Sequence, residues 1–169
     1  LLTNSGFDVW SNSTLENVTG TNLITNAVDQ TFGGSGNWGN QPNTTNSVGS
    51  GVITVTSGNG TYTGISINAG FSGLTSNLEV GKLYEYSATI TSAGGNPIND
   101  SAFLLTVISE STGTTWAKDI TIDGSAKSLV FEADYAGEVR LLVRVPLLND
   151  TETWTVDDVS LYEVTPGCV

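Results

Sequence analysis

Two aromatic residues lie in segments so polar that no apolar pattern predicts their burial. Trp38 lies in the segment 36–41 (GNWGNQ), and Tyr62 lies in the segment 59–64 (NGTYTG). An exposed indole or phenol ring beside amide and hydroxyl groups can stack on the weakly polarised C–H face of a sugar ring. We therefore take Trp38 and Tyr62 as candidate stacking residues. Trp116, at the start of a predicted strand, is a further candidate, with packing at the rim or in the core as an equal alternative.

Two arginines form the second group of candidate binding residues. Arg140 and Arg144 are two of only five cationic residues, and a spacing of four residues along a strand places them on one face, about 13 Å apart. A guanidinium group can bind vicinal hydroxyls or a sugar carboxylate through paired hydrogen bonds. Leu142, between them, could form the floor of a groove. The alternative is ordinary surface ion pairing with Glu85 or Glu132.

The composition excludes several classes of function. The chain has 169 residues, with 5 Lys and Arg against 17 Asp and Glu, and a net charge of −12. So few cations argue against nucleic acid and against an anionic membrane surface as partners. Because there is no histidine, a Ser-His-Asp triad and a zinc site of the usual ligands are impossible. Cys168 is the only cysteine, so no internal disulfide forms.

These candidate residues must be positioned by strands. Runs of β-branched and aromatic residues alternate with turn-forming clusters, which predicts an all-β sandwich and no helix. We expect the segment 12–46 to be mostly loop with one short strand, and we expect residues 1–169 to form a single domain. The predicted strands are 2–9, 23–30, 51–57, 61–67, 83–91, 102–109, 115–122, 128–133, 138–145 and 154–164.

The side chains that face the core can be assigned on three of these strands, because successive side chains point to opposite sides of a sheet. The strand 102–109 is apolar on both faces, which is typical of a central strand whose second face is also covered. The residues predicted to face the core are Val139, Leu141, Val143 and Val145, then Tyr84, Tyr86, Ala88 and Ile90, then Leu129, Phe131, Ala133 and Tyr135.

Three motifs together resemble a known family. They are the segments 2–8 (LTNSGFD), 81–88 (GKLYEYSA) and 154–161 (WTVDDVSL). In this order they resemble the opening strand, a middle strand and the closing strand of jelly-roll carbohydrate-binding modules of families four, nine and twenty-two, which have a galactose-binding-like topology. The resemblance implies a β-sandwich jelly roll that binds a polysaccharide.

The same resemblance implies a structural calcium ion that joins the first strand to the last. Its implied ligands are the carbonyl of Gly6 and the carboxylates of Asp8 and Asp157, with Asp158 as the substitute for Asp157. Ca²⁺ takes about six to eight hard oxygen ligands, which carboxylates and carbonyls supply. Adjacent carboxylates in a strand point to opposite faces, so only one of the pair should reach the ion. The alternative is that both are solvated or accept hydrogen bonds from turn N–H groups.

A narrower resemblance concerns the segment 6–11 (GFDVWS), which is similar to the opening of jelly-roll domains in bacteriophage tail and receptor-binding proteins. Modules attached to glycanases usually carry a Gly-Trp pair soon after the first motif, and Trp38 is its nearest counterpart here. The absence of methionine predicts a piece of a longer polypeptide with appended domains. We expect it to be extracellular or associated with a virion.

Three functions are consistent with these patterns. The first is non-catalytic binding of a polysaccharide or bacterial surface glycan, with a structural calcium. The alternative is a structural or adhesion domain of a phage virion or tail protein, without sugar recognition. A glycoside hydrolase needs two carboxylates, but 17 acidic residues make some pair inevitable. Since no acidic residue lies in an apolar, aromatic-lined motif that would raise its pKa, we expect no enzymatic activity.

Overall fold

Runs of β-branched and aromatic residues form most of the structure, because these residue types suit a pleated, half-buried surface. The computed structural model describes residues 15–17, 20–34, 36–67, 78–92, 103–109, 112–137, 139–148 and 151–166. The elements within these ranges are β1 (Leu15–Asn17), α1 (Ala27–Thr31), β2 (Trp38–Asn40), β3 (Thr44–Gly49), β4 (Val52–Ser57), β5 (Gly60–Ile67), β6 (Leu83–Ser92), β7 (Phe103–Ser109), β8 (Thr115–Ile120), β9 (Ala126–Glu132), β10 (Val139–Leu148) and β11 (Glu152–Pro166).

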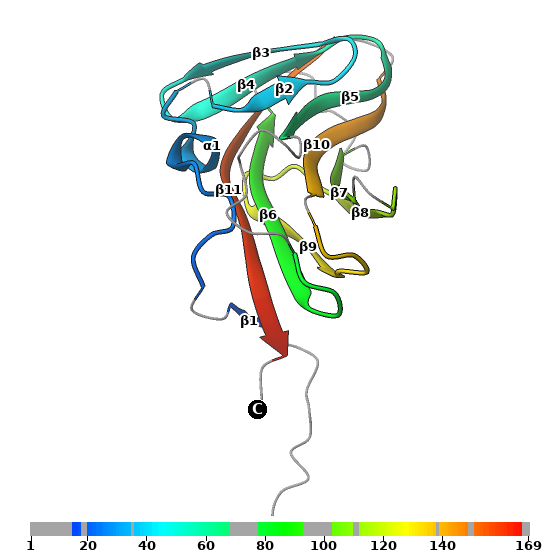
Figure 1. Ribbon diagram of the computed structural model, residues 1–169. Coiled ribbons are helices and arrows are strands. Elements are labelled where there is room, and N and C mark those ends of the chain that lie inside the picture. The colour runs from blue at the N-terminus through cyan, green and yellow to red at the C-terminus, as the bar shows by residue number, and fades with distance from the viewer. Residues whose placement is uncertain are drawn as a thin grey trace, which may run out of the picture.

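The described strands form two sheets, in which hydrogen-bonded neighbours run antiparallel (Figure 1). One sheet has the order β3-β4-β11-β6-β9, with β1 paired to β11. The other has the order β2-β5-β10-β7-β8. The prediction of an all-β jelly-roll sandwich of two antiparallel sheets is therefore confirmed. The predicted strand 2–9 lies outside the described residues.

The hydrophobic core lies between the two sheets. The predicted inward residues of β6 and β10 are all buried, as are Leu129, Phe131 and Ala133, while Tyr135 is half-buried. Phe103 of β7 meets Trp154 of β11 edge-on, with ring centroids 5.0 Å apart and planes at 86°. Such edge-to-face contacts are favoured for aromatic pairs, so this pair connects one sheet to the other within the core.

The segment before β3 differs from the prediction. The expected strand 23–30 is wrong, because residues Ala27–Thr31 form the helix α1. Asn26 caps this helix, its side chain accepting a hydrogen bond from the N–H of Val28, and Phe32 ends it in a left-handed conformation at φ 50°. Asparagine at this position satisfies a backbone donor that the first turn leaves free. The described part of the chain holds no helix long and apolar enough to cross a membrane.

Candidate functional site

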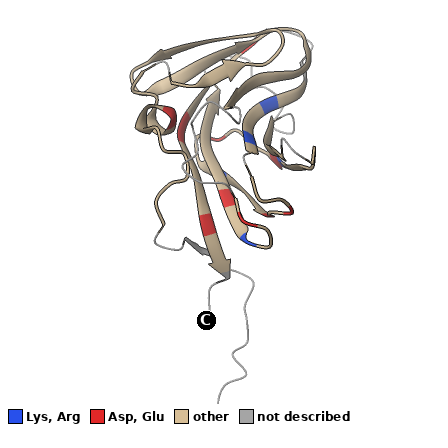
Figure 2. Ribbon diagram, viewed as in Figure 1, with Lys and Arg blue, Asp and Glu red and all other residues tan. Residues whose placement is uncertain are grey.

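Arg140 and Arg144 lie on the outer face of the β2-β5-β10-β7-β8 sheet, the face turned away from the core. Along β10 they alternate with buried core residues, and on β7 they pair with Ile108 and Leu104. Leu142 lies between them on the same face. Figure 2 shows the two arginines as the blue segments of β10. The structure thus places both guanidinium groups on one face, as their spacing predicts.

Arg144 is held against Tyr62 on this outer face. Its guanidinium carbon Cζ lies 4.7 Å from the centroid of the Tyr62 ring, a separation suited to a cation–π contact. Its Nε donates a hydrogen bond to Oγ1 of Thr106, 3.1 Å away. Desolvation by burial lowers the pKa of the Arg144 guanidinium, and the nearby Tyr62 opposes this shift. Two neighbours therefore fix the guanidinium in position.

Tyr62 presents its ring to solvent from an unusual backbone conformation. Its side chain is 53% exposed, and its φ is 54°, a left-handed value that an aromatic residue rarely adopts. Two residues later, Gly64 has a φ of 140°, and a Cβ there would lie 2.3 Å from the carbonyl oxygen of Val143. Only glycine fits at that crossing of β5 and β10. Strained backbone of this kind concentrates at functional sites.

The centre of the outer face is buried. Leu142, Thr106 and Ser66 are all no more than 2% exposed. Gln41 helps to cover Ser66, since its Nε2 donates a hydrogen bond to Oγ of Ser66 at 2.7 Å. Leu142 therefore lies beneath the accessible surface. The accessible part of the outer face is its Tyr62 end together with the exposed residues that point outward from the flanking strands, which are Gly39 on β2 and Thr115, Ala117 and Asp119 on β8.

Trp38 is buried, so the expectation of an exposed stacking ring is wrong. It is only 6% exposed, because the pairing of β2 with β5 sets it opposite the core residue Ile67. Its ring packs on Phe32 with centroids 5.9 Å apart, and its Nε1 donates to the backbone oxygen of Asp29 at 3.0 Å. This indole stabilises the fold and presents no face to a ligand.

Trp116 also lies on the core side of its sheet. On β8 it pairs with the buried Val107 of β7, and its ring packs on Phe131 of the opposite sheet with centroids 4.9 Å apart. It is half-buried, and we drop it from the candidate site. Trp154 is fully buried in the core. Trp38, Trp116 and Trp154 therefore all point toward the core, and no tryptophan of the described residues lies on the outer face. Tyr62 is thus the aromatic candidate that the structure retains.

The salt-bridge alternative does not account for Arg144. Glu85 and Glu132 lie on β6 and β9, in the other sheet. The salt bridges within the described residues are made by Lys82 and Lys127, and none of them reaches Arg144. Within the part of the chain that the structure describes, its contacts are a neutral hydroxyl and a neutral ring.

The implied calcium ligands fall in two parts of the chain. Gly6 and Asp8 lie outside the described residues. Asp157 and Asp158 lie at a β-bulge of β11, where the pairing with β6 shifts register. Asp158 is exposed at φ 49°, and its N–H donates to Oδ1 of Asp157 at 2.8 Å. The described ranges contain no group of three or more His, Cys, Asp or Glu placed to hold a metal.

Asp158 rather than Asp157 lines a small hollow beside this bulge. The hollow has a volume of about 190 Å³, and its lining includes Gln30, Thr31 and Ser160. The Nε2 of Gln30 donates to the carbonyl of Ile24, which leaves its amide oxygen as an acceptor. The lining thus includes one carboxylate, the amide oxygen of Gln30 and the hydroxyls of Thr31 and Ser160, and oxygen is the ligand type that Ca²⁺ requires.

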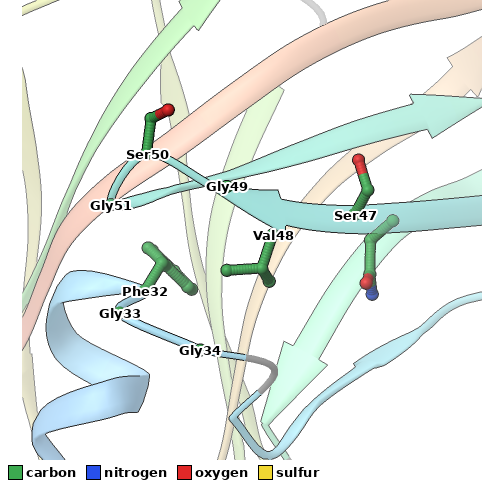
Figure 3. Close-up of a pocket in the computed structure, with 9 residues that line it drawn as sticks. Phe32, Gly33, Gly34, Ser47, Val48, Gly49, Ser50 and Gly51 are labelled. Atoms are coloured by element: carbon green, nitrogen blue, oxygen red, sulfur yellow. The ribbon is translucent and has the colours of Figure 1, made fainter.

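A larger hollow lies between the loop after α1 and the β3–β4 hairpin (Figure 3). Its volume is about 390 Å³, and it is lined by Phe32, Gly33, Gly34 and residues 46–51. No charged side chain is among these residues. Phe32 is only 1% exposed, so its ring offers no stacking surface. This hollow lacks both kinds of group that the outer face supplies at Tyr62 and Arg144.

No protein-family model and no curated protein sequence matches the chain. Solved structures do match. A family 4 carbohydrate-binding module has a TM-score of 0.54 and 16% identity, with 75% of this chain and 94% of the module covered. The CBM22-1 xylan-binding domain of Paenibacillus barcinonensis Xyn10C has a TM-score of 0.53 and 13% identity, with 82% of this chain and 94% of that domain covered.

A third similar structure holds the CBM22-1 and GH10 modules of the Clostridium thermocellum endo-1,4-β-D-xylanase 10B, complexed with xylohexaose. The TM-score is 0.55 and the identity 18%, and the match covers 79% of this chain but only 27% of that one. These similarities establish the fold: the chain is a β-sandwich of the kind found in carbohydrate-binding modules, which in that xylanase accompanies a catalytic module.

Proposed function

We propose that the protein binds a carbohydrate without transforming it, and that the binding site is the Tyr62 end of the outer face. The observation that carries this proposal is the exposed Tyr62 ring held beside the guanidinium of Arg144. The shared fold with carbohydrate-binding modules supports it. The ligand is a polysaccharide or a bacterial surface glycan, and Arg140 extends the polar surface along β10.

The two groups supply complementary interactions. The accessible part of the Tyr62 ring stacks on the C–H face of a sugar. The guanidinium of Arg144 donates hydrogen bonds to oxygen atoms in the plane of its fork. Because Thr106 and the Tyr62 ring already fix this guanidinium, little conformational freedom is lost when a ligand binds, and such pre-organisation favours affinity.

The proposal includes a structural calcium ion, with Asp158 as its carboxylate ligand from β11. The oxygen atoms around the 190 Å³ hollow support this assignment, and Asp157 is the less suitable member of the pair because it does not line that hollow. The ion supplies a cross-link between segments of the chain and no chemistry at the sugar. Gly6 and Asp8 stay in the proposal as the partners that the family resemblance implies.

Affinity gel electrophoresis against a panel of neutral and acidic polysaccharides tests the binding function. The proposal predicts that at least one polymer retards the wild-type protein and that Tyr62→Ala abolishes the retardation. Thr45→Ala, an exposed substitution on β3 in the other sheet, is the matched control and should be retarded like the wild type. A folded wild-type protein that no polymer retards contradicts the proposal.

The alternative function, a structural or adhesion domain of a phage virion, makes a different prediction. It requires a stable trimer or another assembly of the sheets, whereas carbohydrate binding requires only a monomer. Gel filtration with light scattering distinguishes the two. Under either function we propose that the protein acts outside the cell or on a virion and that further domains belong to the same polypeptide.

A further inference from the structure

Arg144 is a cation without a described counter-charge in a strongly acidic protein. The chain carries 17 acidic residues against 5 cationic ones. Lys82 and Lys127 are neutralised by carboxylates, and Lys118 donates to the backbone oxygen of Ser128 at 2.7 Å. The contacts of Arg144 within the described residues are both uncharged.

The guanidinium of Arg144 keeps donors for a ligand. Arginine carries about five N–H donors in a planar fork, and the hydrogen bond to Thr106 uses the one on Nε. The group is half-buried, so water compensates its charge less fully than at an open surface. A carboxylate is planar and accepts two parallel hydrogen bonds from such a fork, and these charge-assisted bonds are about twice as strong as neutral ones.

Arg144 has uncharged neighbours on both adjacent strands. On β5 it pairs with Gly64, which carries no side chain and no charge. On the other side it pairs with Leu104, and only beyond Leu104 does the exposed carboxylate of Asp119 follow on β8. The second arginine of this face, Arg140, lies four residues along the same strand. No carboxylate therefore faces Arg144 from the residues paired with it on β5 and β7, although the net charge of the chain is negative.

We propose that the ligand is an acidic polysaccharide whose uronate carboxylate pairs with Arg144 while a sugar ring lies against Tyr62, an inference that rests on the carbohydrate-binding function proposed above. A neutral sugar would use the same donors, but it would leave the half-buried charge without a counter-ion.

The test compares uronate polymers with the same polymers after chemical reduction of their carboxyl groups. Polygalacturonate, alginate and a β-linked glucuronan serve as the acidic probes, each beside its carboxyl-reduced form, with isothermal titration calorimetry as the readout. We expect one acidic polymer to bind and its reduced form to bind about tenfold to hundredfold more weakly. This factor corresponds to the loss of hydrogen bonds that involve a charged group.

Variants separate the specific contact from general electrostatics. Arg144→Gln should weaken uronate binding by a similar factor, and Arg144→Lys should recover only part of it, because lysine offers a point charge without the fork. Lys118→Gln is the matched control: it removes one positive charge from β8, which is separated from β10 by β7, on the opposite side of the sheet, and it should bind as the wild type does. Melting temperatures verify that each variant is folded.

The possible failures are distinguishable. Equal affinity for a uronate polymer and its reduced form overturns the acidic-ligand inference while leaving carbohydrate binding intact, and so does binding to neutral or sulfated polymers alone. Equal losses in Arg144→Gln and Lys118→Gln also overturn it, because the effect would then be non-specific. No binding to any acidic, reduced, sulfated or neutral polymer contradicts the proposed function itself.

Discussion

The guanidinium of Arg144 lies over the ring of Tyr62, with 4.7 Å between Cζ and the ring centroid. The two residues come from neighbouring strands, β10 and β5, and the backbone of Tyr62 adopts a left-handed φ of 54° at this point. An exposed ring and a half-buried cation are thus held together on the outer face before any ligand arrives. Each prediction below follows from this arrangement or from the core that supports it.

Replacing Tyr62 by alanine should weaken carbohydrate binding and leave stability nearly unchanged. Tyr62 is an exposed residue outside the core, so its removal costs little core packing, whereas loss of the stacking surface should lower affinity by about tenfold or more. Tyr62→Phe is the matched control, since it keeps the ring and should retain most of the affinity. Titration calorimetry checks both variants, and wild-type affinity in Tyr62→Ala would exclude the ring from the site.

Replacing Trp38 should lower stability without affecting binding. Trp38→Ala deletes a buried ring and should cost about 3–5 kcal/mol of unfolding free energy. Trp38→Phe keeps most of the volume but loses the hydrogen bond from Nε1 to Asp29, which should cost about 1 kcal/mol or somewhat more. Urea denaturation measures both values. Normal stability combined with lost binding in Trp38→Phe would restore this indole as a ligand contact.

Two buried tyrosines should respond in opposite directions to removal of their hydroxyl groups. The hydroxyl of Tyr86 is buried without a hydrogen-bond partner within the described residues, so Tyr86→Phe should stabilise the protein by about 1 kcal/mol. The hydroxyl of Tyr84 accepts a hydrogen bond from the N–H of Glu79 at 2.8 Å, so Tyr84→Phe should destabilise it by a similar amount. Equal effects in urea denaturation would be inconsistent with this difference in pairing.

The buried hydroxyl of Tyr86 also predicts a loss of stability at alkaline pH. Burial raises the pKa of Tyr86 far above its ordinary range, whereas a tyrosine of the unfolded chain ionises with a pKa of about 10. Above about pH 10 the unfolded state releases a proton that the folded state keeps, so stability is full below that pH and falls as the pH rises through it. Between about pH 9 and 11, Tyr86→Phe should lose less unfolding free energy than the wild type.

Removal of calcium should lower the melting temperature. An ion bound only by the folded state stabilises that state by mass action, so excess chelator should shift thermal unfolding downward and added Ca²⁺ should reverse the shift. Asp158→Asn should abolish this response, while Asp157→Asn should retain most of it because its amide oxygen can still accept the N–H of residue 158. An unchanged melting temperature, together with a negative metal analysis, would remove the ion from the account.

The sequence predicts the faces of the regular strands well. In β6 and β10 the alternation of apolar and polar residues follows the pleat, and every predicted inward residue of the described set 84–90 and 139–145 is buried. The shared face of Arg140 and Arg144 follows from the same period. A period of two is a local property, so local sequence is sufficient to predict it.

Contacts between distant segments could not be predicted in this way. Trp38 lies among glycines and asparagines, yet it is buried because α1 and Phe32 fold back against it and because β2 joins the edge of β5. The contact between Tyr62 and Arg144 depends on the register of β5 against β10 and on the tight crossing at Gly64. Register of this kind is set by turns and packing partners, which single-segment patterns do not contain.

The most direct test of the outer-face site is a map of the amide chemical shifts perturbed by a bound glycan. A ¹H–¹⁵N titration with the tightest-binding oligosaccharide should perturb the amides of Tyr62, Arg144 and their neighbours on β5, β7 and β10. Perturbations confined to the hollow beside Phe32 or to the outer face of the β3-β4-β11-β6-β9 sheet would contradict a binding site at Tyr62 and Arg144.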